Sequence, residues 1–279
     1  MMQKVSRRKF VRYAASIGAG LLITRLGLSS LSMLKGGKWS ALVKSAKASS
    51  TTGGSSSPPR YAYVVDVGTC IGCRKCVQAC KIENGTPQGM FWMELIYPAN
   101  ADYRYLPRPC MHCNNPPCTK VCPVTARYKR DDGLVLTDFE RCIGCRYCEV
   151  ACPYGVNHFN WSDPKNSQGE FDSTTGILKN YRDRDGRATA GGGHAIGVME
   201  KCTWCVQRID KGKLLPACVE ICPVHALHFG DLNDPSSEVS NFLSKNKYFR
   251  LLDDLGTEPK VYYVGGYPPH EQQYATKGA

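Results

Sequence analysis

The sequence lacks an apolar run of about eighteen residues, the shortest that usually crosses a bilayer as a helix, so a bundle of membrane-spanning helices is excluded. It contains no G-x-G-x-x-G turn and no phosphate-binding loop. It also shows no Ser/His/Asp array and no paired carboxylates placed for acid–base catalysis. Aromatic residues make up 10% and charged residues 22% of the chain, which argues against intrinsic disorder. These absences leave the interpretation that the chain is a folded protein without recognisable catalytic side chains.

Acidic residues are missing from residues 1–48, which hold ten of the 36 Lys and Arg residues. The segment starts with a basic stretch that includes Arg7 and Arg8, continues weakly apolar, and ends in Ala46-Lys47-Ala48. Paired arginines before a mildly hydrophobic stretch and an A-x-A-like site are typical of a twin-arginine signal peptide. We therefore expect export in the folded state to the periplasm or the outer face of the membrane.

The basic excess of the chain comes from this segment. Without its ten positive charges, the formal charge of +12 falls to +2, so the composition does not indicate a nucleic-acid partner. A retained membrane anchor is an alternative to cleavage, but Arg25 in mid-stretch makes it unfavourable. Residues 49–60 are rich in Ser, Gly and Pro and are expected to form a flexible linker.

Cysteine, in contrast, is abundant. The sixteen cysteines form four quartets: Cys70, Cys73, Cys76, Cys80; Cys110, Cys113, Cys118, Cys122; Cys142, Cys145, Cys148, Cys152; and Cys202, Cys205, Cys218, Cys222. Quartets one and three have the C-x2-C-x2-C-x3-C spacing of bacterial ferredoxins, in which three thiolates bind one [4Fe–4S] cube and the fourth binds its neighbour. Proline follows the last cysteine of quartets two, three and four, as in that motif. The pattern predicts four [4Fe–4S] clusters.

Two other uses of cysteine fit less well. Structural zinc sites usually take two C-x2-C pairs, and not runs of four. Disulfides between cysteines of one short loop close rings too small to restrict the unfolded chain. A zinc-stabilised structural protein is kept as a remote alternative.

The spacing also indicates how the quartets combine. Nineteen residues separate quartets two and three, with an Asp132-Gly133 turn between Ala126–Lys129 and Leu134–Thr137, which predicts a hairpin within one ferredoxin-like unit. Quartets one and four would then form a second unit around it, with strand-like runs at Tyr61–Val65 and Ala195–Val198. Spacing alone leaves the pairing of one with two and three with four open.

The expected fold is therefore α+β, with two nested bacterial-ferredoxin-like two-cluster units, short hairpins and long loops. The expected domains are an outer unit of residues 61–108 and 195–256, an inserted unit of residues 109–161, a loop insertion at 162–194 and a C-terminal tail at 257–279.

Two segments, Pro109–Trp161 and Lys201–Pro235, resemble the four-cluster electron-transfer subunits of the dimethyl sulfoxide, polysulfide, tetrathionate and nitrite reductase systems. The twin-arginine signal together with the sequence CPYGVNHFNW is most similar to the periplasmic iron–sulfur subunit of the membrane complex linked to dissimilatory sulfite reduction. The resemblance implies a relay of single electrons and no catalysis by this chain alone. It implies a polytopic quinone-interacting membrane subunit as partner, with a multihaem cytochrome c or a molybdopterin catalytic subunit. The sulfite-linked complex is the first hypothesis, and a periplasmic molybdopterin reductase of the tetrathionate or polysulfide type is the alternative.

The resemblance further implies crossed ligation. Cluster A would be held by Cys70, Cys73, Cys76 and Cys222; cluster B by Cys202, Cys205, Cys218 and Cys80; cluster C by Cys110, Cys113, Cys118 and Cys152; and cluster D by Cys142, Cys145, Cys148 and Cys122. Trp204 and Tyr147, each inside a C-x2-C pair, are expected either to shield clusters from water or to pack as ordinary loop residues. His112, inside quartet two, is expected to form hydrogen bonds rather than to ligate haem.

Overall fold

A computed structural model of the chain describes residues 57–99, 101–161, 181–189, 196–213 and 215–268. These residues belong to the second of two units into which the chain divides, Gly53–Ala279. The predicted export signal, residues 1–48, lies outside the described residues, as do residues 49–56 of the predicted linker.

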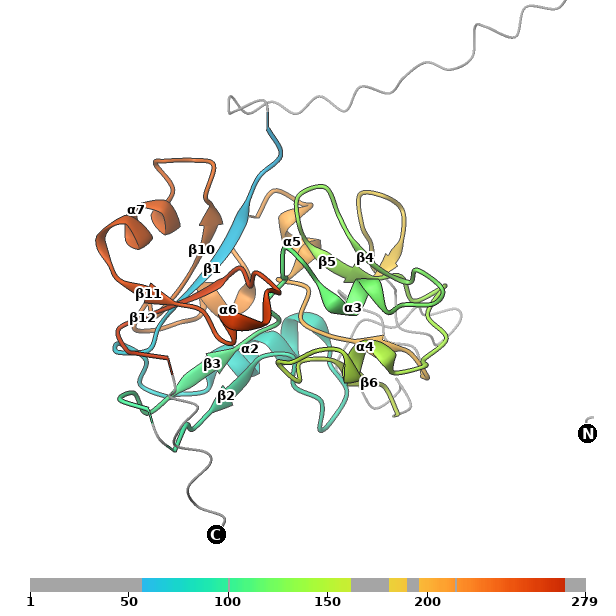
Figure 1. Ribbon diagram of the computed structural model, residues 1–279, viewed down its shortest axis with the longest axis horizontal. Coiled ribbons are helices and arrows are strands. Elements are labelled where there is room, and N and C mark those ends of the chain that lie inside the picture. Colours follow the sequence, from blue (N-terminus) through green and yellow to red (C-terminus); the bar gives the residue numbers. More distant parts are fainter. Residues whose placement is uncertain (1–56, 100, 162–180, 190–195, 214, 269–279) are drawn as a thin grey trace, which may run out of the picture. The chain divides into compact units, whose positions relative to one another are not determined.

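A four-stranded sheet brings the two ends of the described chain together (Figure 1). Its order is β10–β1–β12–β11, from β10 (Leu227–Asp231) through β1 (Tyr61–Asp66) and β12 (Val261–Val264) to β11 (Tyr248–Phe249). Strand β1 runs antiparallel to β10 and parallel to β12. The strand that precedes quartet one therefore pairs with the strand that follows quartet four.

Strand β1 is buried on both faces. Tyr63 and Val65 pack into the main hydrophobic core, whereas Ala62 and Val64 pack against Val239 of helix α7, which spans Glu238–Lys245. Because successive side chains of a strand point to opposite faces, a strand covered on both sides is apolar throughout. This explains why the first strand reads as a nearly continuous apolar run.

Short elements joined by loops fill the rest of the unit. They are α2 (Lys75–Asn84), β2 (Glu94–Ile96), β3 (Leu106–Arg108), α3 (Pro117–Lys120), β4 (Arg127–Lys129), β5 (Val135–Thr137), α4 (Tyr147–Val150), β6 (His158–Phe159), β7 (Tyr181–Arg182), β8 (Ala188–Thr189), β9 (Met199–Glu200), α5 (Val206–Ile209), α6 (Ala217–Glu220) and the 3₁₀ helix η3 (Asp253–Leu255). The ladders β2–β3, β4–β5, β6–β9 and β7–β8 are antiparallel pairs. None of the described helices has the length and apolar character needed to cross a membrane.

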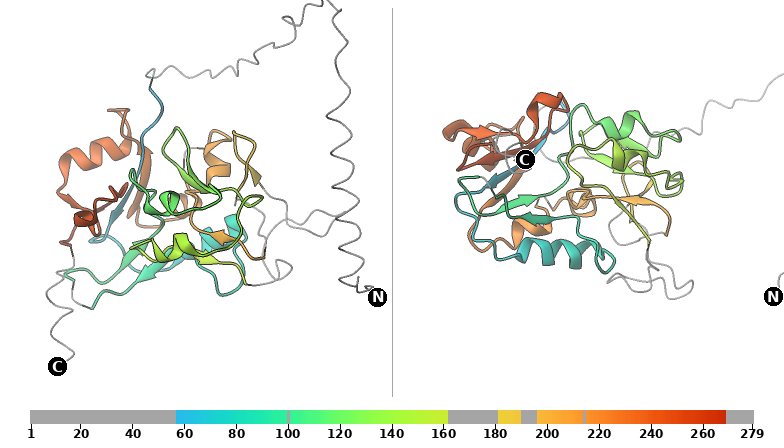
Figure 2. Two further views of the ribbon diagram at one scale, coloured as in Figure 1. Left: turned by 45° about the vertical axis from the view of Figure 1, so that its right-hand side comes forward. Right: turned by 60° about the horizontal axis from the view of Figure 1, so that its bottom comes forward.

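The views in Figure 2 show how the chain is layered. The first part of the described chain and its last part lie together, and the green middle part, with α3, β4, β5 and α4, lies beside them. Helices α2 and α6, which carry cysteines of quartets one and four, contact each other, and so do α3 and α4, which carry cysteines of quartets two and three. The elements thus associate pairwise in a nested way.

Two strand predictions from the sequence are confirmed and one is wrong. The Asp132-Gly133 hairpin exists as β4–β5, and Tyr61–Val65 lies in β1. Ala195 lies outside the described residues, and Ile196–Val198 do not form the expected strand; the strand here is β9, which begins at Met199 and pairs with β6. Gly197 has a left-handed φ of 82°, which interrupts extended structure just before β9.

The expected tail and loop insertion also contain strands. Val261–Val264, within the expected tail at 257–279, forms the inner strand β12, because its apolar side chains are buried against β1. Within the expected loop insertion at 162–194, residues 181–189 form the β7–β8 hairpin. There the backbone carbonyl of Ala188 accepts a hydrogen bond from the N–H of Phe139 at 2.9 Å.

Candidate metal centres

Four cysteines line each of three cavities. The lining sets are Cys70, Cys73, Cys76 and Cys222; Cys110, Cys113, Cys118 and Cys152; and Cys142, Cys145, Cys148 and Cys122. In each set, three cysteines come from one quartet and the fourth comes from another. In the part of the chain that the structure describes, no three His, Cys, Asp or Glu side chains form a group that could hold a single metal ion.

The remaining four cysteines also lie together. The pKa of Cys80 is raised well above its usual value. Burial is the main cause, and the nearby thiols of Cys202, Cys205 and Cys218 add to it. The side-chain amide of Asn84 donates to the sulfurs of both Cys80 and Cys205, at 3.6 and 3.7 Å. The four groups have the same members as the sets A, B, C and D above, and we call them groups A to D.

Short helices carry the third cysteine of each quartet. Cys76 lies in α2, Cys118 in α3, Cys148 in α4 and Cys218 in α6. The C-x3-C spacing places the fourth cysteine about one helical turn further on, so its sulfur is displaced along the helix from the third. This offset allows the fourth sulfur to reach a different cavity from the third.

One turn conformation recurs in all four quartets. The residue before the second cysteine has a positive φ: 70° at Gly72, 41° at His112, 66° at Gly144 and 55° at Trp204. Glycine adopts this conformation freely, whereas other residues incur a cost of about 1–2 kcal/mol. The backbone therefore repeats four times, but the side chain at this position is an imidazole in quartet two and an indole in quartet four.

The cysteine thiols are strongly desolvated. Burial raises the pKa of Cys76 and of Cys113 to about 12, and repulsion from neighbouring thiolates adds to the effect. Burial, followed by the Cys110 thiolate, raises the pKa of Cys202 to about 12. Metal ligands must be thiolates, so these sites need a bound cation core to hold the negative charge.

The surroundings of Arg127 indicate whether an anionic cluster fits between these residues. Its side chain is buried, at 3% exposure, and its Nη2 donates to Cys148 Sγ at 3.4 Å. Its Nε and Nη1 have no hydrogen-bond partner, and no carboxylate among the described residues pairs with it. A buried guanidinium without an anionic partner is costly, whereas an oxidised cube with four thiolates carries a net charge of about −2. The buried cation therefore fits a [4Fe–4S] group in this place.

Backbone amides also point at the sulfurs. The N–H of His112 lies 3.5 Å from Cys110 Sγ, and the N–H of Trp204 lies 3.5 Å from Cys202 Sγ. The N–H of Arg127 lies 3.4 Å from Cys122 Sγ, and the N–H of Met199 lies 3.4 Å from Cys142 Sγ. The N–H of Ala226 lies 3.3 Å from Cys222 Sγ. Such contacts stabilise negative charge on the sulfur and raise the reduction potential of a bound cluster.

The four groups differ in exposure. Cys73 of group A and Cys145 of group D are exposed, and so are the neighbouring apolar residues Ile71 and Ile143, at 56% and 63%. All four cysteines of group B are buried, with exposures between 4% and 6%. Three cysteines of group C are buried as well. Groups A and D therefore reach the surface, whereas B and C lie inside.

The two aromatic residues expected near clusters differ in burial. Trp204 is 1% exposed and packs inside the core, consistent with shielding, whereas Tyr147 is 55% exposed. His112 is fully buried and does form hydrogen bonds, as expected. Sequence reasoning missed Arg127 and Tyr63, whose hydroxyl lies 3.2 Å from Cys218 Sγ. No local pattern marks either residue, because each meets its cysteine only through the folding of the chain.

Comparisons with known proteins agree with the cysteine pattern. Three family models, each described as a 4Fe-4S dicluster domain, match residues 63–126, 101–175 and 141–227. The chain is 41% identical over 224 residues to a protein of Halobacterium salinarum described as a candidate dimethyl sulfoxide reductase iron–sulfur subunit, covering 74% of this chain and 79% of the relative.

Two further relatives show a similar extent of match. A selenate reductase subunit of Mesobacillus selenatarsenatis is 40% identical over 218 residues, covering 74% of this chain and 72% of the relative. The iron–sulfur cluster-binding subunit of menaquinone reductase of Nitratidesulfovibrio vulgaris is 38% identical over 240 residues, covering 74% and 88%.

Proposed function

The chain belongs to the family of 4Fe–4S dicluster iron–sulfur subunits of dimethyl sulfoxide, selenate, arsenate and tetrathionate reductases, and we propose that it serves a respiratory reductase with a molybdopterin catalytic subunit. Its role is electron transfer within a multi-subunit oxidoreductase, and its cofactors are four [4Fe–4S] clusters. The substrate of the complex is set by the catalytic partner, because this chain supplies electrons only.

In this proposal each cluster is bound by one cysteine group, so that groups A to D are the ligand sets. Quartets one and four form the outer ferredoxin-like unit, residues 61–108 and 195–256, and quartets two and three form the inserted unit, residues 109–161. The lining of three cavities, the β1–β10 pairing and the β4–β5 hairpin support this nesting.

We place the four sites in the order A, B, C, D. Tyr63 lies near both group A and group B. Burial is the main cause that raises the pKa of its hydroxyl, and the thiols of Cys218 in group B and Cys76 in group A raise it further. Cys110 of group C is close enough to Cys202 of group B to raise the pKa of Cys202. The observation that carries the proposal is the exposure of Cys73 and Cys145 at the two ends of the line, with B and C buried between them. Electrons would enter at one end and leave at the other.

The residues of the chain have three tasks in this relay. Bound clusters supply one-electron redox chemistry over a wide range of potentials. The thiolates fix the positions of the sites, the packed aromatic core excludes water from B and C, and backbone N–H groups with Arg127 stabilise negative charge. No residue of the chain makes or breaks a bond in this function.

The two ends of the line suit two partners. Exposed apolar side chains beside groups A and D, including Ile71 and Ile143, provide contact surface for them. We propose a quinone-interacting membrane subunit at one end and the catalytic subunit at the other. The complex would act in the periplasm or on the outer face of the membrane, after export by the signal at residues 1–48.

A second candidate is the sulfite-reduction-linked membrane complex, in which a multihaem cytochrome c takes the place of the molybdopterin subunit. The 38% identity to the menaquinone reductase subunit supports it, since the name of that relative concerns quinone chemistry. Mild detergent extraction and co-purification of the native complex separate the two: a molybdopterin chain supports the first candidate, and a multihaem cytochrome supports the second.

Anaerobic purification tests the relay itself. We expect about sixteen irons per chain, four in each of four clusters, and a low-temperature EPR spectrum of interacting cubes after reduction. Stoichiometric zinc without iron would instead indicate the zinc-stabilised structural protein.

A ligand substitution tests the crossed pairing. Cys222→Ser is expected to convert or remove the cluster of Cys70, Cys73 and Cys76, because Cys222 lines that cavity. EPR redox titration should show the other three clusters unchanged. Selective loss of the cluster of Cys202 would contradict the crossed pairing, and Cys80→Ser, which should affect that cluster instead, is the matched control.

Export can be tested separately. Replacing Arg7 and Arg8 by Lys is expected to keep the precursor in the cytoplasm, because the twin-arginine route recognises the arginine pair. Cell fractionation with the single substitution Arg12→Lys as control measures this. Normal export of the double variant would argue against the proposed signal.

A further inference from the structure

Two rings meet where quartets two and four approach each other. His112 and Trp204 have ring centroids 4.3 Å apart and planes inclined by 30°. His112 is 0% and Trp204 1% exposed. Both occupy the position before the second cysteine, so they come from corresponding turns of the two quartets.

Reciprocal hydrogen bonds connect these turns. His112 Nε2 lies 3.0 Å from the carbonyl oxygen of Cys202, and Trp204 Nε1 donates to the carbonyl oxygen of Cys110 at 3.1 Å. Each ring therefore reaches across to the first cysteine of the other quartet. Cys110 belongs to group C and Cys202 to group B, so the ring pair joins the two buried sites.

The tautomer of His112 follows from its second contact. The backbone N–H of Val135 donates to His112 Nδ1 at 3.0 Å, which leaves Nε2 as the protonated nitrogen that donates to Cys202. Because Nδ1 accepts one hydrogen bond and Nε2 lies within hydrogen-bond distance of a carbonyl oxygen, the imidazole is neutral and held in one orientation.

The backbone at these positions gives a further indication. The corresponding residues of quartets one and three are Gly72 and Gly144, which adopt the left-handed conformation freely. His112 and Trp204 adopt it against the steric preference of residues that carry a Cβ atom. At this one position of the four quartets, a side chain is retained in spite of strain in quartets two and four, whose turns meet, and a glycine stands in quartets one and three.

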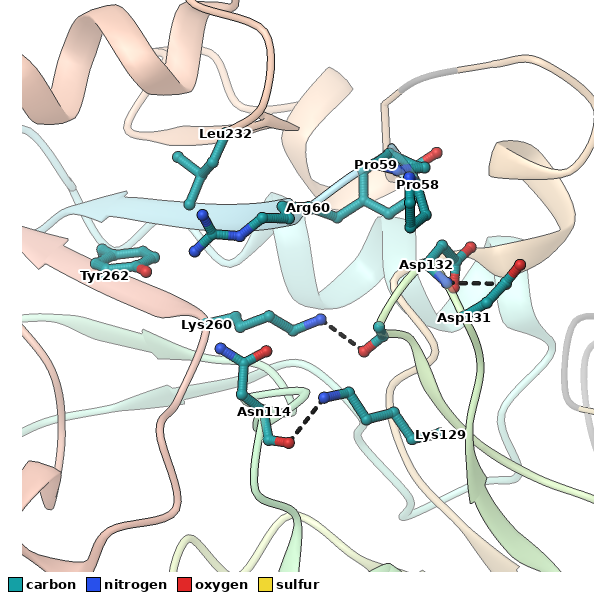
Figure 3. A pocket seen from close by; sticks show the side chains of 12 residues that line it. Pro58, Pro59, Arg60, Asn114, Lys129, Asp131, Asp132, Leu232, Lys260 and Tyr262 are labelled. Atoms are coloured by element: carbon teal, nitrogen blue, oxygen red, sulfur yellow. Dashed lines mark hydrogen bonds between the residues drawn. The ribbon is translucent and has the colours of Figure 1, made fainter. Parts of the chain in front are cut away.

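Two buried ammonium groups hold the ring pair. Lys201 Nζ donates to the same Cys202 carbonyl at 3.0 Å. Lys260 Nζ lies 5.3 Å from the centre of the Trp204 ring and donates to the carbonyl oxygen of Gly133 at 2.6 Å. Figure 3 shows Lys260 where it lines a pocket together with Asn114 and Asp132. The ring pair is enclosed by packed and hydrogen-bonded groups.

We propose that the His112–Trp204 pair is the electron-transfer junction between groups B and C, the one step of the relay that crosses from the outer to the inserted unit. This inference rests on the proposed function. Each passage moves one electron: the donor side is oxidised by one electron as the acceptor side is reduced by one, with no bond made and no proton moved. The two hydrogen bonds provide a short connected path between the Cys110 and Cys202 backbones, and the rings keep water out of it.

The test removes the two inter-unit hydrogen bonds one at a time and keeps a ring in place, although His112→Phe also removes the acceptor of the Val135 N–H. His112→Phe and Trp204→Phe each lose one inter-unit hydrogen bond, and the double variant loses both. Tyr263→Phe is the matched control, since it also loses one buried aromatic hydrogen bond, to the carbonyl oxygen of Pro107, away from the junction. Pulse radiolysis of the purified four-cluster protein measures how fast electrons redistribute among clusters. EPR measures the magnetic coupling between reduced neighbours, which reports their spacing.

We expect all variants to keep four clusters and wild-type magnetic coupling. Redistribution should slow by roughly tenfold in the double variant, the scale seen when outer partners of metal ligands are removed, less in the single variants, and not in Tyr263→Phe. Wild-type redistribution in the double variant would overturn the proposal. Slowing that occurs only together with changed magnetic coupling would also overturn it, because the pair would then merely set the spacing. If His112→Phe does not fold, the rate of electron redistribution and the magnetic coupling in Trp204→Phe are compared with wild type by the same criteria. A wild-type protein without iron would instead refute the proposed function.

Discussion

At the scale of single residues, Arg127 shows how the chain prepares for a group that it must bind. Its guanidinium lies beside Cys148 of group D, and the effect of burial on its pKa is offset by the thiols of Cys118 and Cys148, so that the pKa is raised. A cation fixed between two cluster sites stabilises the reduced, more negative form of each. Its unpaired N–H groups are thus explained by function rather than by packing.

Removal of this charge should lower reduction potentials. Arg127→Gln is expected to shift the clusters of groups C and D downward by on the order of 60 mV, which corresponds to about tenfold in a one-electron equilibrium. EPR-monitored redox titration measures the shift. Arg250→Gln, which removes a partly exposed guanidinium paired with Asp253, should leave all four potentials unchanged. Equal shifts in both variants would show that Arg127 acts only through net charge.

At the scale of elements, the C-x2-C turns combine a fixed backbone with variable side chains. Gly144 has a φ of 66°, and a Cβ atom at this position would collide with the carbonyl oxygen of Gly197 and lie 2.9 Å from the Phe159 ring. The turn of quartet three therefore packs directly on the approach to β9, which leaves no room for a side chain. Gly155 has a similar φ of 62°, but no atom lies within 4 Å of the point that a Cβ atom would occupy there.

This contrast separates backbone strain from steric conflict. Gly155→Ala is expected to lower the unfolding free energy by about 1–2 kcal/mol, the usual penalty for a left-handed alanine. Gly144→Ala adds overpacking and should cost about 2–5 kcal/mol, with loss of the cluster of group D before the others. Denaturant unfolding and iron content measure both effects. Equal destabilisation of the two variants would mean that the contact with Gly197 is relieved by a small shift.

At the scale of the whole molecule, charge changes sign when the clusters are counted. Without residues 1–48 the formal charge is +2, and four oxidised cubes with their thiolates add about −2 each, which gives roughly −6. The basic character of the chain therefore comes from residues 1–48, the proposed export signal. The proposed partners should meet a mildly acidic protein with apolar surface at both ends of the cluster line.

A buried ion triad also ties the two proposed units together. Arg130, directly after β4, donates through Nε and Nη2 to Asp132 at 2.6–3.1 Å, and through Nη1 and Nη2 to Asp210 after α5 at 2.7–2.8 Å. The side chains of Arg130 and Asp132 are each 1% exposed. Because Asp210 lies between the second and third cysteines of quartet four, this contact joins the inserted hairpin to the outer unit.

Loss of the arginine should destabilise the whole protein. Arg130→Met leaves two buried carboxylates with only the more distant Arg184, whose Nη2 lies 3.7 Å from Asp132, and we expect a loss of about 3–5 kcal/mol. Thermal unfolding of the holo-protein measures it, with Arg182→Met as control, since the exposed Arg182–Glu140 pair should contribute at most about 1 kcal/mol. A loss below about 1 kcal/mol for Arg130→Met would show that water replaces the cation.

The sequence by itself determined the cofactor and the local turns. Spacings such as C-x2-C-x2-C and the Asp132-Gly133 pair act over a few residues, and local chain geometry fixes what such short segments can do. The tertiary structure decided which fourth cysteine completes each cavity, the place of Val261–Val264 in the central sheet, and the contacts of Arg127, His112 and Trp204. These depend on residues far apart in the chain, whose meeting results from burial of the whole core and leaves no local signal in the sequence.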